Sequence, residues 1–178
     1  MYIQLLSILC LVIIDRVLKV YMTGYLSGVA RIDFIPGIIH FTYVENTGAS
    51  FGILKDKTLL LSIVTFVVII CLLYYIVSRK SDSRLLTISL ILITAGGIGN
   101  LYDRIVHGYV VDYIEFSFMN YAIFNFADAL VNVGAVTLFI YLIFFEKSLF
   151  RTSKVEQDDS INLEDINDLE DNGEIDEE

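Results

Sequence analysis

Four aspartates stand within or beside apolar stretches of this sequence: Asp15, Asp103, Asp112 and Asp128. Ionisable side chains are costly in such surroundings, so these positions are candidates for function. Two buried carboxyl groups placed close together share a proton, because desolvation and mutual repulsion raise their pKa values. The ionised group can then take a proton from water while the protonated group polarises a carbonyl. The chemistry expected of such a pair is peptide hydrolysis.

Two of the aspartates have cationic neighbours in the sequence. Asp15 and Lys19 are four residues apart, which places them on one face of a helix with the acid on the favourable N-terminal side. Asp103 directly precedes Arg104. Nearby positive charge keeps a carboxylate ionised, so a structural role is expected for both.

Asp112 and Asp128 lie among apolar and aromatic residues, with no basic residue close by in the sequence. Desolvation is expected to raise their pKa values, which suits shared acid and base catalysis. The preferred catalytic pair is therefore Asp112 with Asp128, and Asp103 with Asp128 is the alternative.

Other hydrolytic chemistries find less support. The chain has no His-Glu-x-x-His motif and no Cys/His cluster, which disfavours a zinc peptidase. His40 and His107 are expected to be surface or interfacial residues. Gly48-Ala49-Ser50 begins like the rhomboid motif, but the next residue breaks it. A dyad of Ser50 with Lys19 or Lys55 stays open, although no spacing selects it.

These residues must be positioned within a membrane. Apolar residues make up 56% of the 178-residue chain and the mean hydropathy is +0.67, values that a soluble domain of this size rarely reaches. Apolar stretches predict four transmembrane helices at about residues 1–22, 59–77, 85–101 and 122–145. The expected fold is an all-α membrane protein with four transmembrane helices. A small extracytoplasmic β-rich segment is expected at about residues 23–58, between the first two spans.

Basic residues predict the orientation. Arg79, Lys80 and Arg84 connect the second and third spans, and further basic residues follow the fourth. The positive-inside rule makes this side and both termini cytoplasmic. At about 1.5 Å per helical residue, Asp15, Asn100 and Asp128 then lie roughly 20 to 25 Å from the cytoplasmic ends of their spans. In a core of about 30 Å, they share one layer near the outer face.

Glycines precede this polar layer on the third span, at Gly96, Gly97 and Gly99. Small residues let helices approach closely in lipid, so close helix packing is expected there.

Acidic residues are concentrated at the end of the chain. Residues 156–178 contain twelve of the 22 acidic residues and no Lys or Arg. The rest holds ten acidic and twelve basic residues, a net charge of +2. We therefore expect a membrane domain at residues 1–150 and an acidic cytoplasmic tail at 151–178, disordered because it has few large apolar residues.

Five motifs in order resemble the lipoprotein signal peptidases, also called signal peptidase II. They cover about residues 1–146 and are Asp15-Arg16-Val17-Leu18-Lys19, Asn46-Thr47-Gly48-Ala49-Ser50-Phe51, Gly99-Asn100-Leu101-Tyr102-Asp103-Arg104, Val110-Val111-Asp112 and Phe124-Asn125-Phe126-Ala127-Asp128. Ser50 stands where this family often has alanine, and the acidic tail lies outside the pattern.

The resemblance implies an intramembrane aspartic endopeptidase of the bacterial cytoplasmic membrane. It would remove the signal peptide from diacylglyceryl-modified prolipoproteins just before the lipidated cysteine, with no metal or cofactor. The implied catalytic residues are Asp112 and Asp128. The implied substrate-binding or supporting residues are Asn46, Arg104, Asp15, Lys19, Asn100, Asp103 and Asn125. The implied partners are these substrates and membrane lipids, with no nucleic acid, and a monomer is expected.

Two other functions find less support in the sequence. A presenilin-like aspartyl protease would need Gly-x-Gly-Asp, but Gly97-Ile98-Gly99 is followed by Asn100. A small transporter would also contain buried charges, and inverted repeats would favour it, but the sequence shows none.

Overall fold

The structure, a computed structural model, describes residues 2–48, 54–78, 83–118 and 123–145. Its helices are α1 (Tyr2–Leu26), α2 (Thr58–Ser78), α3 (Arg84–His107) and α4 (Phe126–Phe144). Its strands are β1 (Ile32–Ile35), β2 (Ile39–Asn46), β3 (Val110–Phe116) and β4 (Ile123–Phe124). Residues up to Leu138 form one compact unit, and α4 continues beyond it. The predicted acidic tail lies outside the described residues.

Three described helices, α2, α3 and α4, are long and apolar enough to cross a membrane. The 25-residue α1 is not among them and contains Asp15, Arg16 and Lys19. The observed bounds of α2 agree with the predicted span to within one residue at each end. Helical membrane architecture is thus confirmed, and the count of four spans stays a prediction.

Three predicted helix ends are wrong. α1 continues to Leu26 rather than ending at about Met22, because both side chains are buried against the sheet. α3 continues to His107, where Gly108 ends it with a left-handed φ of 81° and a backbone bond to Arg104 O. The fourth predicted span included residues 123 and 124, but these form β4 and the helix begins at Phe126.

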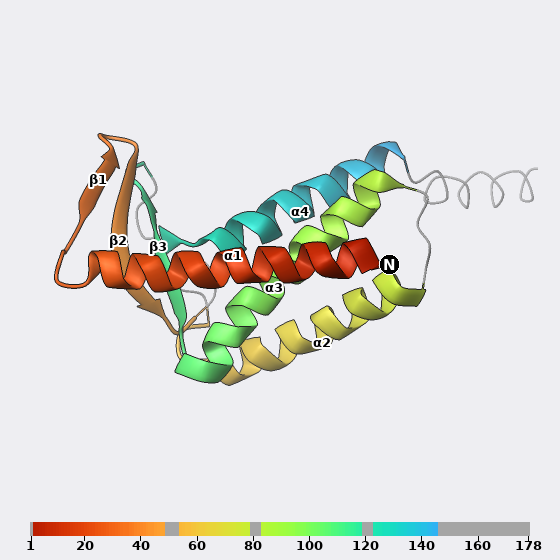
Figure 1. The fold of residues 1–178 in the computed structure, drawn as a ribbon, viewed down its shortest axis with the longest axis horizontal. Helices are drawn as coiled ribbons and strands as arrows, with labels where there is room; N and C mark the ends of the chain where they lie inside the picture. The colour runs from red at the N-terminus through yellow and green to blue at the C-terminus, as the bar shows by residue number, and fades with distance from the viewer. Residues whose placement is uncertain (1, 49–53, 79–82, 119–122, 146–178) are drawn as a thin grey trace, which may run out of the picture. The chain divides into compact units, whose positions relative to one another are not determined.

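The strands form one antiparallel sheet in the order β1-β2-β3-β4. The first two strands lie in the predicted β-rich segment, whereas β3 and β4 come from the connection between α3 and α4. In the β2–β3 register, Val44 stands opposite Asp112. Figure 1 shows the sheet at one end of the helices, where the chain leaves α1 toward β1 and where α3 ends. The sheet therefore joins two distant segments beside the ends of these helices.

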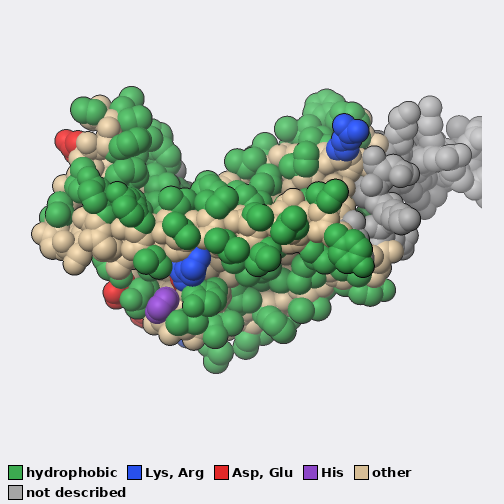
Figure 2. Space-filling model, in the orientation of Figure 1, with side chains coloured by type: hydrophobic (Ala, Val, Ile, Leu, Met, Phe, Trp, Pro, Cys, Tyr) green, Lys and Arg blue, Asp and Glu red, His purple; other side chains and the backbone are tan. Residues whose placement is uncertain are grey.

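The predicted glycine packing is confirmed on α3. A Cβ added to Gly96 would stand 2.3 Å from the Ala127 backbone oxygen of α4, and one added to Gly99 would stand 2.5 Å from Asp15 Oδ2 of α1. Only glycine allows these approaches. The outer surface of the helices is largely apolar, with few charged side chains on the face seen in Figure 2.

Candidate active site

Asp112 and Asp128 line one cavity of about 340 Å³. Asp112 lies on β3 with 2% of its surface exposed, and Asp128 is the third residue of α4. The α2 side of this cavity is apolar apart from Thr65, and its other lining residues are Leu61, Val64, Val68, Ile69 and Leu72. The cavity thus combines two carboxyl groups with an apolar wall.

The start of α4 fixes Asp128 in place. Asn125 precedes the first helical residue, and its Oδ1 accepts a hydrogen bond from the Asp128 backbone N–H at 3.0 Å. In return, Asp128 Oδ2 accepts from the Asn125 backbone N–H at 3.1 Å. This reciprocal pair is a capping box, which satisfies two N–H groups that the helix itself cannot bond. Local helix capping therefore orients the Asp128 carboxylate.

Asp112 is held between two amide side chains from different elements. Asn46 Nδ2, at the end of β2, donates to Asp112 Oδ2 at 2.8 Å. Asn125 Nδ2 donates to Asp112 Oδ1 at 2.6 Å and also to Asn100 Oδ1 at 3.2 Å. Asn125 therefore contacts both aspartates, with its backbone and Oδ1 at Asp128 and its Nδ2 at Asp112.

Lys19 determines the orientation of the Asn100 amide. An ammonium group only donates hydrogen bonds, so the Asn100 oxygen must face Lys19 Nζ, which lies 2.9 Å away. The Asn100 nitrogen is then turned to Asp128, and it donates to Asp128 Oδ1 at 2.7 Å. A buried cation thus acts through one asparagine on a cavity carboxylate.

Behind these amides lies a buried layer of ion pairs. Lys19 is fully buried, and its Nζ lies 3.0 Å from Asp15 Oδ2 and 2.8 Å from Asp103 Oδ2. Asp103 also pairs with Arg16 Nη1 at 2.5 Å. Asp15 Oδ1 accepts from the Ala127 backbone N–H of α4 at 3.1 Å. Buried charges are tolerated when they are paired in this way, and here they tie α1 to α3 and α4.

Arg104 lines the cavity, and its Nη2 donates to the Gly48 backbone oxygen at 3.0 Å. Asn46 Oδ1 accepts from the Gly48 backbone N–H at 2.9 Å. Both side chains therefore fasten the segment after β2 at the cavity. The Arg104 Nε is buried and has no hydrogen-bond partner among the described residues.

The pKa of Asp112 is displaced toward neutrality. Burial, and then the negative charge of Asp128, raise the pKa of the Asp112 carboxyl to about 7, while the amides of Asn46 and Asn125 work in the opposite direction. Near neutral pH a large fraction of Asp112 is therefore protonated. Asp112 can donate a proton at a pH where an ordinary aspartate cannot.

The structure brings all nine predicted site residues into this connected network around the cavity. The predicted Asp15–Lys19 ion pair is confirmed. Asp103, however, finds its cations on α1 rather than at Arg104, its neighbour in the sequence. The role of Arg16 was missed, although it pairs with Asp103 and lies over the Tyr102 ring at 4.8 Å. Arg16 and Asp103 are 87 residues apart, and nothing in the sequence links them.

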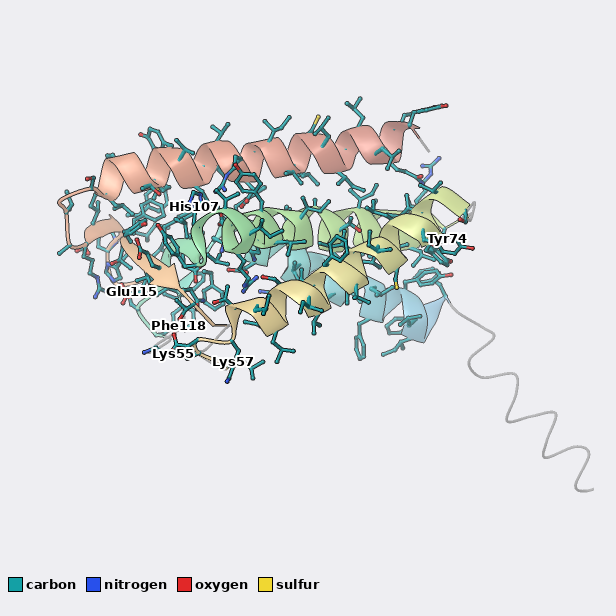
Figure 3. The ribbon with its side chains drawn as sticks, turned by 90° about the horizontal axis from the view of Figure 1, so that it is seen from below. Lys55, Lys57, Tyr74, His107, Glu115 and Phe118 are labelled. Atoms are coloured by element: carbon teal, nitrogen blue, oxygen red, sulfur yellow. The ribbon has the colours of Figure 1, made fainter. Side chains whose placement is uncertain are left out.

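The other candidates lie elsewhere. His40 is 7% exposed, so it is buried and not at the surface: its imidazole bonds Asp33 at 2.6 Å and Ser117 within the sheet region. His107 is exposed at the end of α3 (Figure 3). Ser50 lies outside the described residues. Lys55 is exposed just before α2, where Figure 3 labels it.

Comparison with known sequences gives one consistent family. The family described as "Signal peptidase (SPase) II" matches residues 7–144. A lipoprotein signal peptidase of Clostridium novyi is 41% identical over 143 residues, which are 79% of this chain and 97% of that protein. One of Streptococcus pneumoniae is 39% identical over 137 residues, 76% of this chain and 89% of that protein.

A solved bacterial membrane enzyme has the same fold. Its superposition covers 83% of this chain and 92% of that structure, with a TM-score of 0.72 and 27% sequence identity. Sequence and fold agree along nearly the whole of the described chain. The chain therefore belongs to the signal peptidase II family of aspartic endopeptidases, which are bacterial membrane enzymes.

Proposed function

We propose that this enzyme removes the signal peptide from diacylglyceryl-modified prolipoproteins by cutting the bond just before the lipidated cysteine. The observation that carries the proposal is one cavity lined by both aspartates and by an apolar wall from α2. Relatives with about 40% identity are lipoprotein signal peptidases. A cavity of this composition suits an apolar signal helix whose end reaches the carboxyl groups.

In the proposed mechanism, Asp128 is the ionised base and Asp112 is the protonated acid. Asp128 accepts one hydrogen bond from the Asn100 side chain of α3 and one from the Asn125 backbone N–H, and it lies at the N-terminus of α4, where the helix dipole favours negative charge. Asp112 has its pKa raised to about 7, so a proton is available near neutral pH. The two side chains thus have different hydrogen-bond partners, and the proposal gives them different roles.

The proton transfers then balance in two steps. Asp128 takes a proton from water as the water oxygen attacks the scissile carbonyl, and Asp112 gives its proton to the carbonyl oxygen. The product of this step is a tetrahedral diol. Asp128 next protonates the leaving nitrogen while Asp112 takes a proton from a diol hydroxyl, so the C–N bond breaks and both carboxyl groups return to their starting state. Lys19, paired with Asp15 and Asp103, holds the Asn100 amide in one orientation throughout.

We further propose four membrane spans, with α1 as the first and both termini on the cytoplasmic side. The charges of α1 are Asp15, Arg16 and Lys19, and each has an ion-pair partner within the protein. Internal pairing lowers the cost of placing them within lipid. The sheet and the aspartates then lie near the outer face, where the lipidated cysteine of a substrate would be anchored.

The proposal is tested by mass spectrometry of products. Purified enzyme with EDTA present is given a diacylglyceryl-modified prolipoprotein and the same chain without its lipid. We expect cleavage of the lipidated chain alone, with the modified cysteine at the new N-terminus. Cleavage at another bond, or equal cleavage of both chains, would contradict the proposed substrate and cutting site.

A further inference from the structure

Among the asparagines that line the cavity, Asn132 is unlike the rest. Asn46 and Asn100 both hydrogen-bond the aspartates, as described above. Asn132 is exposed and lines the same cavity, and its side-chain amide makes no hydrogen bond within the described part of the chain. It lies on α4, one helical turn beyond Asp128 and away from the sheet.

The surroundings of Asn132 make an unpaired amide costly. The facing α2 wall is apolar except for Thr65, whose methyl group lies 3.9 Å from the position of a Cβ added to Gly97. A polar side chain on a membrane helix normally faces a partner or a water-filled cavity. Within the described residues the Asn132 side chain has no hydrogen-bond partner, so an occupant of the cavity can supply one.

The distance along α4 indicates which part of an occupant Asn132 would meet. Asn132 follows Asp128 by four residues, or about 6 Å at the helical rise of 1.5 Å. A chain whose cut bond lies at the aspartates covers about 6 Å with two extended residues or with four helical ones. The residues concerned are therefore the second to the fourth before the cut bond.

The chemistry of the pairing follows from the amide. Asn132 offers an N–H donor and a carbonyl acceptor, so it can bond a hydroxyl or another amide in either direction. Val64 and Val68 on the facing wall would leave an ionised side chain unsolvated. The match is therefore a small neutral polar side chain: serine, threonine or asparagine.

We propose that Asn132 is a specificity-determining residue that hydrogen-bonds a neutral polar side chain of the signal peptide, two to four residues before the cut bond. This inference rests on the proposed function. Such a hydrogen bond makes the enzyme prefer a substrate with serine at that place over the same substrate with alanine. One neutral hydrogen bond in such a site corresponds to a preference of about five- to tenfold in kcat/KM.

The test is competition between two lipidated substrates in one reaction. Three substrate pairs differ only by serine or alanine at the second, third or fourth residue before the cut bond. The enzymes are wild type, Asn132→Leu, Asn132→Thr and the control Val133→Leu. Leucine keeps the branched shape of asparagine and removes its polar atoms. Val133 is exposed and does not line the cavity.

We expect wild type and Val133→Leu to prefer serine at one of these positions by about five- to tenfold. Asn132→Leu should lose that preference, and Asn132→Thr should keep part of it. The ratio within one reaction does not depend on how much enzyme folds. A wild type without preference at all three positions, or an Asn132→Leu ratio equal to that of wild type, would overturn the inference. Failure of wild type to cut any lipidated substrate would instead refute the proposed function on which the inference rests.

Discussion

α3 and α2 lie side by side, yet they are built on opposite principles. In the most apolar 18-residue stretch of each helix, 50% of the residues of α3 are buried but only 11% of those of α2. α3 buries polar residues with their partners, including Asn100 and Asp103, and it contacts α1 and α4 through glycines. α2 is more apolar and leaves most of its surface to lipid or to the cavity. The difference teaches that α3 packs closely and braces the cavity aspartate Asp128 through Asn100, whereas α2 supplies an apolar wall.

The largest effect on stability is expected from removing the cation behind the site. Lys19→Met leaves Asp15 and Asp103 buried beside each other without their common partner. Breaking a buried ion pair in this way costs about 3 to 5 kcal/mol. The thermal unfolding midpoint in detergent should fall sharply.

The matched control is Arg31→Met, whose partially exposed side chain lies 3.5 Å from Glu115. An ion pair of this kind contributes at most about 1 kcal/mol. Equal losses for the two variants would contradict the stabilising role of the buried ion pairs between α1 and α3.

Alanine substitutions at Gly96 and Gly97 compare the packing of α3 against α4 with its packing against α2. Gly96→Ala would place a Cβ 2.3 Å from the backbone oxygen of Ala127, whereas Gly97→Ala would meet two α2 side chains, Ile69 at 3.3 Å and Thr65 at 3.9 Å. The first should destabilise the fold by about 1 to 3 kcal/mol, as overpacking does. The second should have less effect, since a side chain can move. Chemical or thermal unfolding would measure the order, and a greater loss for Gly97→Ala would reverse the comparison.

Asp112→Asn should stabilise the protein at alkaline pH while it abolishes activity. Burial first, and Asp128 second, raise the pKa of Asp112 from 3.8 to about 7, so the folded state binds this proton more tightly than the unfolded state. The stability that Asp112 contributes is therefore full below about pH 4 and is lost as the pH rises toward 7. At pH 8 the variant should unfold at a higher temperature than wild type, and the difference should shrink toward pH 5. A difference that is independent of pH would contradict the raised pKa.

The smallest effect on stability is expected on the α2 wall. Val68 lines the cavity and is half exposed, so Val68→Phe should narrow the cavity and raise KM several-fold. Its stability should stay within about 0.5 kcal/mol of wild type, as for other surface substitutions. Val67→Phe, on a neighbouring exposed position outside the cavity, should leave KM unchanged. A raised KM for both variants would show that the effect of the substitution does not come from the cavity lining.

Sequence reasoning succeeded where the signal is local or strongly periodic. The charge-free stretch of α2 gave its bounds almost unchanged, and the i, i+4 spacing predicted the Asp15–Lys19 ion pair. The preferred pair Asp112 and Asp128 could be chosen because both lack a basic neighbour, and the structure places them on one cavity.

Sequence reasoning failed where partners are distant in the chain. Asp103 has Arg104 beside it, yet helix geometry turns it toward Arg16 and Lys19 on α1. β4 lies within a stretch that the sequence predicts as helix, because a two-residue strand is too short to show an alternating pattern of apolar and polar residues. The burial of His40, expected at the surface or an interface, cannot be predicted because its bonds to Asp33 and Ser117 depend on the sheet.

The central claim is that Asp112 and Asp128 act as one catalytic pair. It is tested most directly by the turnover of a lipidated prolipoprotein by wild type, Asp112→Asn, Asp128→Asn and the control Glu115→Gln. Glu115 lies on the same strand as Asp112 and outside the cavity (Figure 3). We expect each aspartate variant to lose at least about 10²- to 10⁴-fold in kcat, the range of general acid–base catalysis, while the control keeps its activity. An aspartate variant that folds and cuts at the wild-type rate would contradict the account.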